Sequence, residues 1–144
     1  MKARIILAAI ILFAIVAIAG ADQPNMQAAH GNLMNAKSEL QKATADKGGH
    51  RANAIGLVNS AIAEVNAGIA FDRRHNHASP VTGEALFAGA PDQPHMQSAL
   101  NSLESAKDDL NRATADKGGH RAKALDYVKD AISEVKKGIE AGRS

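Results

Sequence analysis

A duplication constrains this chain more than any other feature of its sequence. Residues 22–72 and 92–142 align without a gap at an offset of seventy, and 28 of the 51 aligned positions are identical. The longest shared run, Ala43–Ala52, recurs letter for letter as Ala113–Ala122. A repeat of this length is one supersecondary unit present twice, so its periodicity can be read in two independent copies.

The first half of each unit has apolar residues at alternating spacings of three and four, which predicts a helix with a narrow apolar seam. The flanking positions do not stay apolar, since Met34 corresponds to Glu104 and His30 to Leu100. We therefore expect this helix to show one stripe to a single partner and its other sides to water. The seam residues are Met26, Ala29, Leu33, Ala36, Leu40 and Ala43 in the first copy, and Met96, Ala99, Leu103, Ala106, Leu110 and Ala113 in the second.

The second half of each unit has a wider apolar face, in which a heptad of large residues runs beside small residues spaced by seven. The large residues are Ile55, Val58, Ile62, Val65 and Ile69, matched by Leu125, Val128, Ile132, Val135 and Ile139. The small residues are Ala54, Ala61 and Gly68, matched by Ala124, Ala131 and Gly138. Since a wide face needs two neighbours, we expect each second helix to pack on its own first helix and on the second helix of the other copy.

The boundaries of the two helices are marked by turn residues. Asp22 precedes Pro24, which suits the first turn of a helix because its missing N–H costs nothing there. The first helix should run to about Ala45, and Gly48 is suited to the left-handed residue that closes a helix. Each unit is thus predicted to be a helical hairpin. The predicted fold class is all-α, with two homologous antiparallel hairpins packed as a four-helix bundle.

The chain divides into four segments. Residues 1–21 have a basic start, an apolar run and a small-residue end, the layout of a secretory signal peptide. Hairpin repeat 1 follows at 22–71, a Pro-, Gly- and Ser-containing linker at 72–91, and hairpin repeat 2 at 92–144. An uncleaved membrane anchor is the alternative for the first segment. The linker is long enough to leave open whether the two Gly-Gly tips lie at the same end.

Composition excludes several classes of function. Removing the signal segment takes away Lys2 and Arg4 and leaves 15 basic against 15 acidic residues. The basic pI of the whole sequence therefore does not indicate a nucleic-acid-binding surface. Aromatic residues are almost absent, which argues against base-stacking surfaces. The chain has no cysteine, which excludes disulfides and lipid attachment at a cysteine. We expect no nucleic-acid partner, and membrane contact only through an uncleaved signal segment.

The tip between the two helices of each unit is the candidate site for a ligand or a protein partner. It comprises Asp46, Lys47, Gly48, Gly49, His50 and Arg51, and in the second copy Asp116, Lys117, Gly118, Gly119, His120 and Arg121. In a structural interpretation, Asp46 caps the second helix or pairs with Arg51, and His50 binds a closing carbonyl of the first helix. In the alternative, the Lys, His and Arg side chains surround a helix N-terminus and bind a phosphate or carboxylate.

No other chemistry is supported by the motifs. His50 and His120 could share a metal ion only if the tips are adjacent. His75 with His77, and His95 with Met96 and Met26, are further groupings of possible metal ligands, but no metal-specific sequence such as His-Glu-x-x-His is present. No Gly-x-Ser-x-Gly sequence and no acid pair on an apolar face is found. A narrow-seamed hairpin also offers little of the enclosed space that an enzyme needs. We therefore expect no metal, no cofactor and no enzymatic activity.

The tip sequence resembles a family of small exported bacterial proteins that carry this hairpin once or twice. The resemblance rests on Ala-Asp-Lys-Gly-Gly-His-Arg at 45–51 and 115–121, and on Ala-Ile-x-x-Val-x-x-Gly-Ile at 61–69 and 131–139. It implies export and a helical-hairpin fold, and no particular activity. The sequence therefore predicts a periplasmic or secreted structural or interaction module that uses its two tips. The alternative is a periplasmic protein that binds an anion, a small ligand or a metal at the same residues.

Overall fold

A computed structural model describes residues 22–44, 48–75, 92–113 and 118–143 of the chain. These residues form four helices and no strand: α1 (Asp22–Lys42), α2 (His50–His75), α3 (Asp92–Arg112) and α4 (His120–Ala141). The predicted signal segment, and the linker from residue 76 onward, lie outside the described residues.

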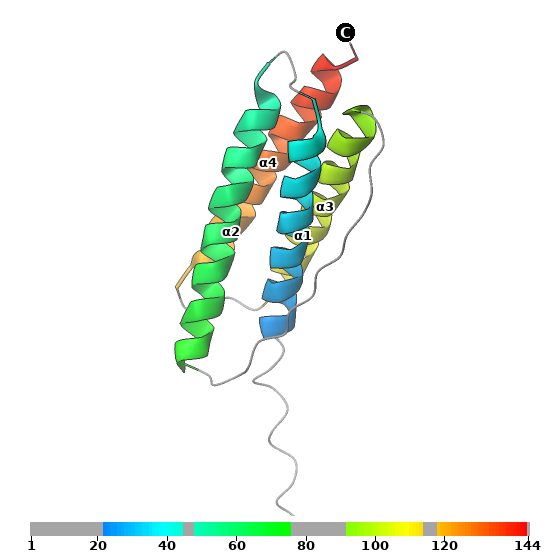
Figure 1. Ribbon diagram of the computed structural model, residues 1–144. Helices are drawn as coiled ribbons and strands as arrows, with labels where there is room; N and C mark the ends of the chain where they lie inside the picture. Colours follow the sequence, from blue (N-terminus) through cyan, green and yellow to red (C-terminus); the bar gives the residue numbers. More distant parts are fainter. Residues whose placement is uncertain (1–21, 45–47, 76–91, 114–117, 144) are drawn as a thin grey trace, which may run out of the picture.

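The four helices form an all-α bundle, as the sequence predicts (Figure 1). Each helix packs against two others: α1 against α2, α3 against α4, α1 against α3, and α2 against α4. Around the bundle the order is therefore α1, α2, α4, α3, and every neighbouring pair runs antiparallel (Figure 1). The expected contact between the two second helices, α2 and α4, is confirmed.

The expectation that each first helix has a single partner is wrong. α1 packs on α2 and also lies close against α3, and the two pairs between the repeats pack more closely than the two pairs within a hairpin. Ala29 and Ala36 of α1 and Ala99 and Ala106 of α3 are fully buried. Alanine adds almost nothing to the helix radius, so a stripe of alanines beside the leucines lets two helix backbones approach. The alanines of the seam therefore serve as a second contact face.

Polar contacts establish the register between the repeats. His50 at the start of α2 contacts Glu134 near the end of α4, and His120 at the start of α4 contacts Glu64 of α2. In this antiparallel register Ala61 of α2 comes level with Ala124 of α4. Both alanines are fully buried, as expected for a close helix contact.

The two repeats are related by an approximate two-fold axis through the bundle. The contacts of His50 with Glu134 and of His120 with Glu64 show this symmetry. Adding seventy to 50 and 64 gives 120 and 134, so the two contacts are the same contact seen from each repeat. As a result the two Gly-Gly tips lie at opposite ends of the bundle (Figure 1). His50 lies beside Glu134, fourteen residues along α4 from His120, so the two histidines are about 21 Å apart along the axis.

Two helix ends differ from the sequence-based boundaries. α1 ends at Lys42, before Ala45, although the N–H of Ala43 still donates to the carbonyl of Glu39. α2 continues to His75 and includes the first four residues of the segment assigned to the linker. Neither Asp72 nor the arginine pair that follows it breaks a helix, so the Pro- and Gly-containing part of the linker begins only after α2.

Candidate functional site

The structure describes Gly48, Gly49, His50 and Arg51 of the first tip and Gly118, Gly119, His120 and Arg121 of the second. The other four predicted site residues, Asp46, Lys47, Asp116 and Lys117, lie outside the described residues. Each described member of the motif has an identifiable structural reason for its residue type, and these reasons are the same in both copies.

The two glycines of each tip have different tasks. Gly49 and Gly119 have φ angles of 69° and 71°, the left-handed conformation that side chains rarely adopt. The sequence assigned this conformation to Gly48, which is wrong: Gly48 is needed for space. A Cβ atom at Gly48 would lie 2.6 Å from the ring of His50, and one at Gly118 would lie 2.7 Å from the ring of His120. The first glycine therefore makes room for the histidine ring, and the second makes the turn.

The arginine of each tip closes the first helix of its own hairpin. Arg51 Nη1 donates to the carbonyl oxygens of Ala43 at 2.6 Å and Leu40 at 3.5 Å, and Arg121 Nη1 donates to that of Leu110 at 2.9 Å. The last carbonyl groups of a helix have no partner within it, and a cation also complements the negative end of its dipole. The sequence assigned a closing carbonyl to His50, but the longer arginine side chain occupies that place.

The histidine of each tip instead joins the two repeats. His50 Nδ1 lies 2.9 Å from Glu134 Oε2, and His120 Nδ1 lies 2.7 Å from Glu64 Oε2. All four side chains are partly buried. An ionised carboxylate can only accept a hydrogen bond, so the Nδ1 atom of each histidine carries the proton and donates it.

The charge on Glu134 is favoured by three donors. Lys137 donates at 2.8 Å, His50 at 2.9 Å and Asn53 at 3.3 Å, and these hydrogen bonds, that of Lys137 foremost, lower the pKa of Glu134 from 4.5 to about 2. Glu134 is therefore ionised at every pH at which the protein would work. Hydrogen bonds to an ionised group are stronger than those between neutral groups, so these three bonds hold Glu134 firmly in place.

A third histidine also joins the repeats. His95 Nδ1 of α3 lies 2.7 Å from Glu39 Oε2 of α1, and Lys42 donates to the other oxygen at 2.9 Å. Burial acts to raise the pKa of Glu39, but the hydrogen bonds from His95 and Lys42 outweigh it, and the pKa is lowered. None of the three glutamates is among the site residues that the sequence predicts. Glu64 and Glu134 were nevertheless visible as an identical pair three residues after the small residues Ala61 and Ala131.

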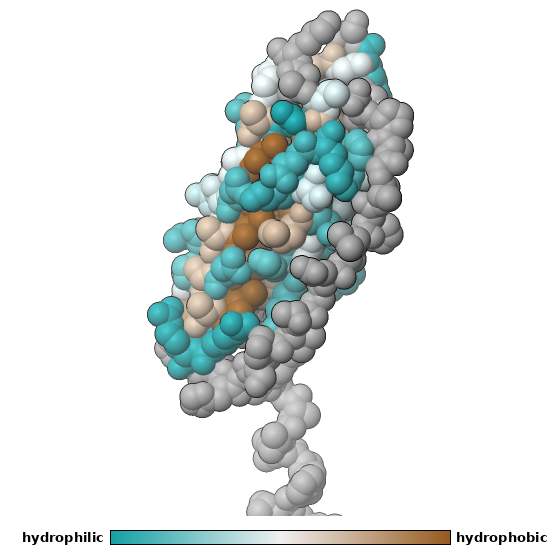
Figure 2. All heavy atoms as spheres, in the orientation of Figure 1, coloured by the Kyte–Doolittle hydropathy of each residue, from teal (hydrophilic) through white to brown (hydrophobic). Residues whose placement is uncertain are grey.

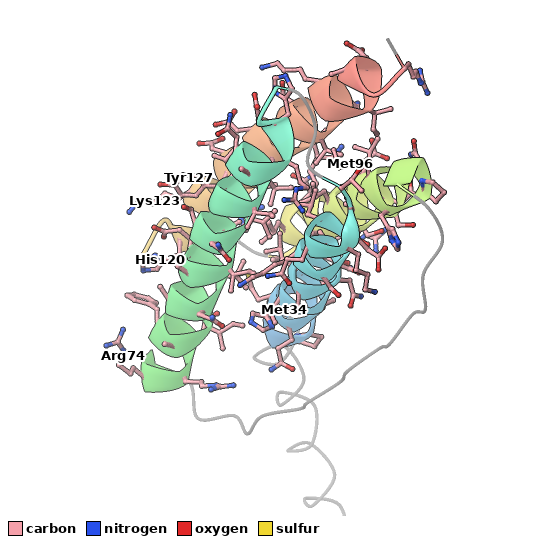
Figure 3. All side chains as sticks on the ribbon, turned by 45° about the horizontal axis from the view of Figure 1, so that its top comes forward. Met34, Arg74, Met96, His120, Lys123 and Tyr127 are labelled. Atoms are coloured by element: carbon pink, nitrogen blue, oxygen red, sulfur yellow. The ribbon has the colours of Figure 1, made fainter. Side chains whose placement is uncertain are left out.

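The geometry of the histidines does not favour a shared metal site. The two tips lie at opposite ends of the bundle, so His50 and His120 do not meet (Figure 1). Among the described residues no group of three or more His, Asp or Glu side chains is placed to hold a metal ion. Figure 3 shows His120 with Lys123 and Tyr127 on α4, one turn and two turns into that helix.

A shallow, open groove of about 740 Å³ lies between the first half of α2 and the second half of α4. Its polar groups are hydroxyl, amide, carboxylate and ammonium groups, of which Asn53 and Lys137 donate to Glu134. The groove is lined by Ala52, Asn53, Gly56, Leu57, Ser60, Asp130, Ser133, Glu134 and Lys137.

The outward sides of α2 and α4 differ strongly although the two helices are repeats of one another. Between Arg51 and Asp72, α2 has one charged residue, Glu64, which is paired with His120. The exposed residues of α2 in this stretch are Ala52, Asn53, Gly56, Asn59, Ala63, Asn66 and Ala70. At the corresponding positions α4 exposes Ala122, Lys123, Asp126, Lys129, Ser133, Lys136 and Glu140. We call the exposed side of α2 between Arg51 and Asp72 the neutral face.

Helix α2 as a whole is also unusual in its hydropathy. The stretch His50–Arg74 is long and apolar enough to cross a membrane by length and composition, and only 33% of its most apolar window is buried in the bundle. A helix that is apolar on all sides is normally covered on all sides. Among the described residues, α2 has neighbours only on the sides of α1 and α4.

The edge of the neutral face toward α1 is also apolar. Ile55 and Ile62 are only partly buried, and Met34 of α1 is 46% exposed. Hydrophobic atoms form a row between α1 and α2 on this side of the molecule (Figure 2). The same seam in repeat 2 is closed, because Leu100 is buried in the place of His30 and Leu125 and Ile132 are only 9% exposed.

The charge pair of repeat 2 shows how position 34 is oriented. Glu104, the counterpart of Met34, forms an ion pair with Lys136 of α4 at 3.9 Å. Position 34 therefore lies at the seam with α2, opposite Asn66, the counterpart of Lys136. Repeat 1 thus exposes apolar and amide groups where repeat 2 has a salt bridge.

Comparisons with known proteins found no match: no family model, no curated protein and no solved structure resembles this chain at a significant level.

Proposed function

We propose that this chain is an exported, non-enzymatic interaction module of the cell envelope, and that the neutral face of α2 is its contact surface. The observation that supports this proposal is the contrast between the two repeats. Positions that are charged on α4 are small or amidic on α2, and Ile55, Ile62 and Met34 remain partly exposed beside them. Exposed apolar surface is typical of interaction sites, and we therefore place the contact surface on this side of the bundle.

The tips support a structural task better than a contact with a partner. The sequence-based prediction placed the partner at the tips, but His50 and Arg51 direct their polar atoms to Glu134 and to the end of α1. The two tips also lie at opposite ends of the bundle, so they do not combine into one surface (Figure 1).

A site-specific crosslinking experiment tests the proposal. A photoreactive amino acid would be placed at position 63, in the middle of the neutral face, and at position 98 of α3 as the control. Ala63 and Ser98 are both exposed, and α3 makes no contact with α2. We expect a crosslinked product in cells from position 63 and none from position 98. Equal crosslinking from the two positions, or none from either, would refute the proposal.

Anion binding at the tips is the second candidate function. Gly49 and Gly119 precede α2 and α4, and Gly119 provides no side-chain cap for the first N–H groups of α4. A helix start of this kind attracts anions. If the tips bind phosphate, the melting temperature should rise with added phosphate, and Arg121→Lys should retain the rise while Arg121→Gln loses it. No change in melting temperature with phosphate would refute this alternative.

A further inference from the structure

We propose that the occupant of the neutral face is a second copy of this chain, with two α2 helices packed antiparallel about a two-fold axis near Ala63. This inference rests on the proposed function, because it names the partner of the same surface. It depends on the pattern of residues along α2, on the charges at the two ends of the face, and on the way in which the chain already packs its own helices.

The residues of the neutral face match an antiparallel copy of themselves. With Ala63 opposite the Ala63 of the second copy, Gly56 comes level with Ala70, and Asn59 comes level with Ala67. No bulky and no charged side chain faces another in this register. Symmetric association of this type presents the same patch from both copies, so a self-complementary face is required.

The charges beyond the ends of the face are complementary in the same register. Arg73 and Arg74 are exposed at the end of α2, and Arg74 points away from the bundle (Figure 3). In the antiparallel pair they come level with the Asn53 and Ala52 of the second copy. There the groove between α2 and α4 carries Asp130 and Glu134 against the single Lys137. Glu134 is already paired with Lys137 and His50, so it is Asp130 of one copy that Arg74 of the other approaches, at both ends of the pair.

The chain contains a precedent for this type of contact. α2 and α4 pack antiparallel and closely, with Ala61 and Ala124 fully buried between them. α1 and α3 do the same with Ala36 and Ala99. Repeat 2 provides the opposite case, since Asp126 and Glu140 replace Gly56 and Ala70 and would place charge at the contact. The exposed side of α2 lacks these charges, whereas that of α4 carries them and is unsuited to a third contact of this kind.

Sedimentation equilibrium of the chain from Asp22 onward, which contains all four described helices, tests the inference. We expect a reversible dimer between about 1 μM and 0.5 mM. The double variant Gly56→Asp with Ala70→Glu copies the residues of repeat 2 and should raise the dimer dissociation constant at least about tenfold. The control Ser98→Asp with Ser105→Glu adds the same two charges to exposed sites of α3 and should leave the constant unchanged.

A charge exchange tests the register. Arg74→Asp should weaken the dimer, and Arg74→Asp combined with Asp130→Arg should restore it. Circular dichroism melts of each variant establish that the bundle is still folded, so that a weaker dimer is a loss of association. A monomer at all concentrations, or a dimer that the neutral-face variants leave intact, overturns the inference.

The crosslinking experiment separates the inference from the proposed function. A product from position 63 with the mass of two chains supports both. A product with any other mass, or binding of the face to lipid vesicles without dimers, retains the interaction surface but overturns the second copy as its occupant. Absence of any product from position 63 overturns both.

Discussion

Replacing Ala61 by leucine tests the closest helix contact of the bundle. Ala61 of α2 is fully buried and lies level with Ala124 of α4, which is also fully buried. Leucine adds three carbon atoms at a point where the two backbones approach and the packed core leaves little space. The larger side chain must push α2 away from α4 or adopt a strained rotamer. Overpacking of this kind costs about 1–3 kcal/mol.

The free energy of unfolding can be measured by urea denaturation followed by circular dichroism. The control is Ala122→Leu, the same change at an exposed position of α4, where we expect a change within about 0.5 kcal/mol. Ala131→Leu, the repeat equivalent of Ala61→Leu, should cost the same as Ala61→Leu because the bundle is nearly two-fold symmetric. If Ala61→Leu is as mild as Ala122→Leu, the proposed close contact of α2 with α4 at this level is refuted.

Three further changes test the tips and the core. Gly49→Ala should lower the free energy of unfolding by about 1–2 kcal/mol because φ is 69° there. Gly48→Ala should destabilise through a clash with His50, so it should have little effect in a His50→Ala background. Equal effects of Gly48→Ala in the two backgrounds would contradict the steric argument. The pKa of Glu134 is lowered to about 2, so the stabilisation from its charge is complete above the ordinary pKa of 4.5 and is lost as the pH falls toward 2. Glu134→Gln should therefore flatten this part of the curve of stability against pH. An unchanged curve would count against the assigned hydrogen bonds. Leu33 and Leu103 are both fully buried. Replacing either by alanine should lower the free energy of unfolding by about 2–5 kcal/mol, and by a similar amount for the two. A large difference between the two variants in urea denaturation would argue against the symmetric core.

The helices and their buried residues were predictable because the duplication shows each pattern twice. Positions outside the shared seam, such as His30 against Leu100, differ between the copies, whereas Val58, Val65 and their counterparts Val128 and Val135 keep the helical period. All four of these valines are fully buried. A periodic pattern of apolar residues is a local property of the chain, so it survives without knowledge of the partner helix.

The tips were only partly predictable, because their contacts depend on the arrangement of the repeats. The sequence predicted a turn at the Gly-Gly pair of each tip. The partner of His50 is Glu134, 84 residues away, and no local pattern identifies it. The choice between a shared and a separate location for the two tips depended on the antiparallel direction of α4 relative to α2, which no local pattern identifies. Long-range register was thus the missing information.

The near two-fold relation between the repeats has a consequence for folding and for surface design. Two separate hairpins would associate only above a threshold concentration, but hairpins on one polypeptide meet at any dilution, because their association is unimolecular. A pair of identical hairpins must also show every outward residue twice. In the fused chain, Gly56 and Asp126 can differ while the shared interior stays the same. Covalent linkage thereby permits one side of the bundle to become uncharged while the opposite side keeps its charged residues.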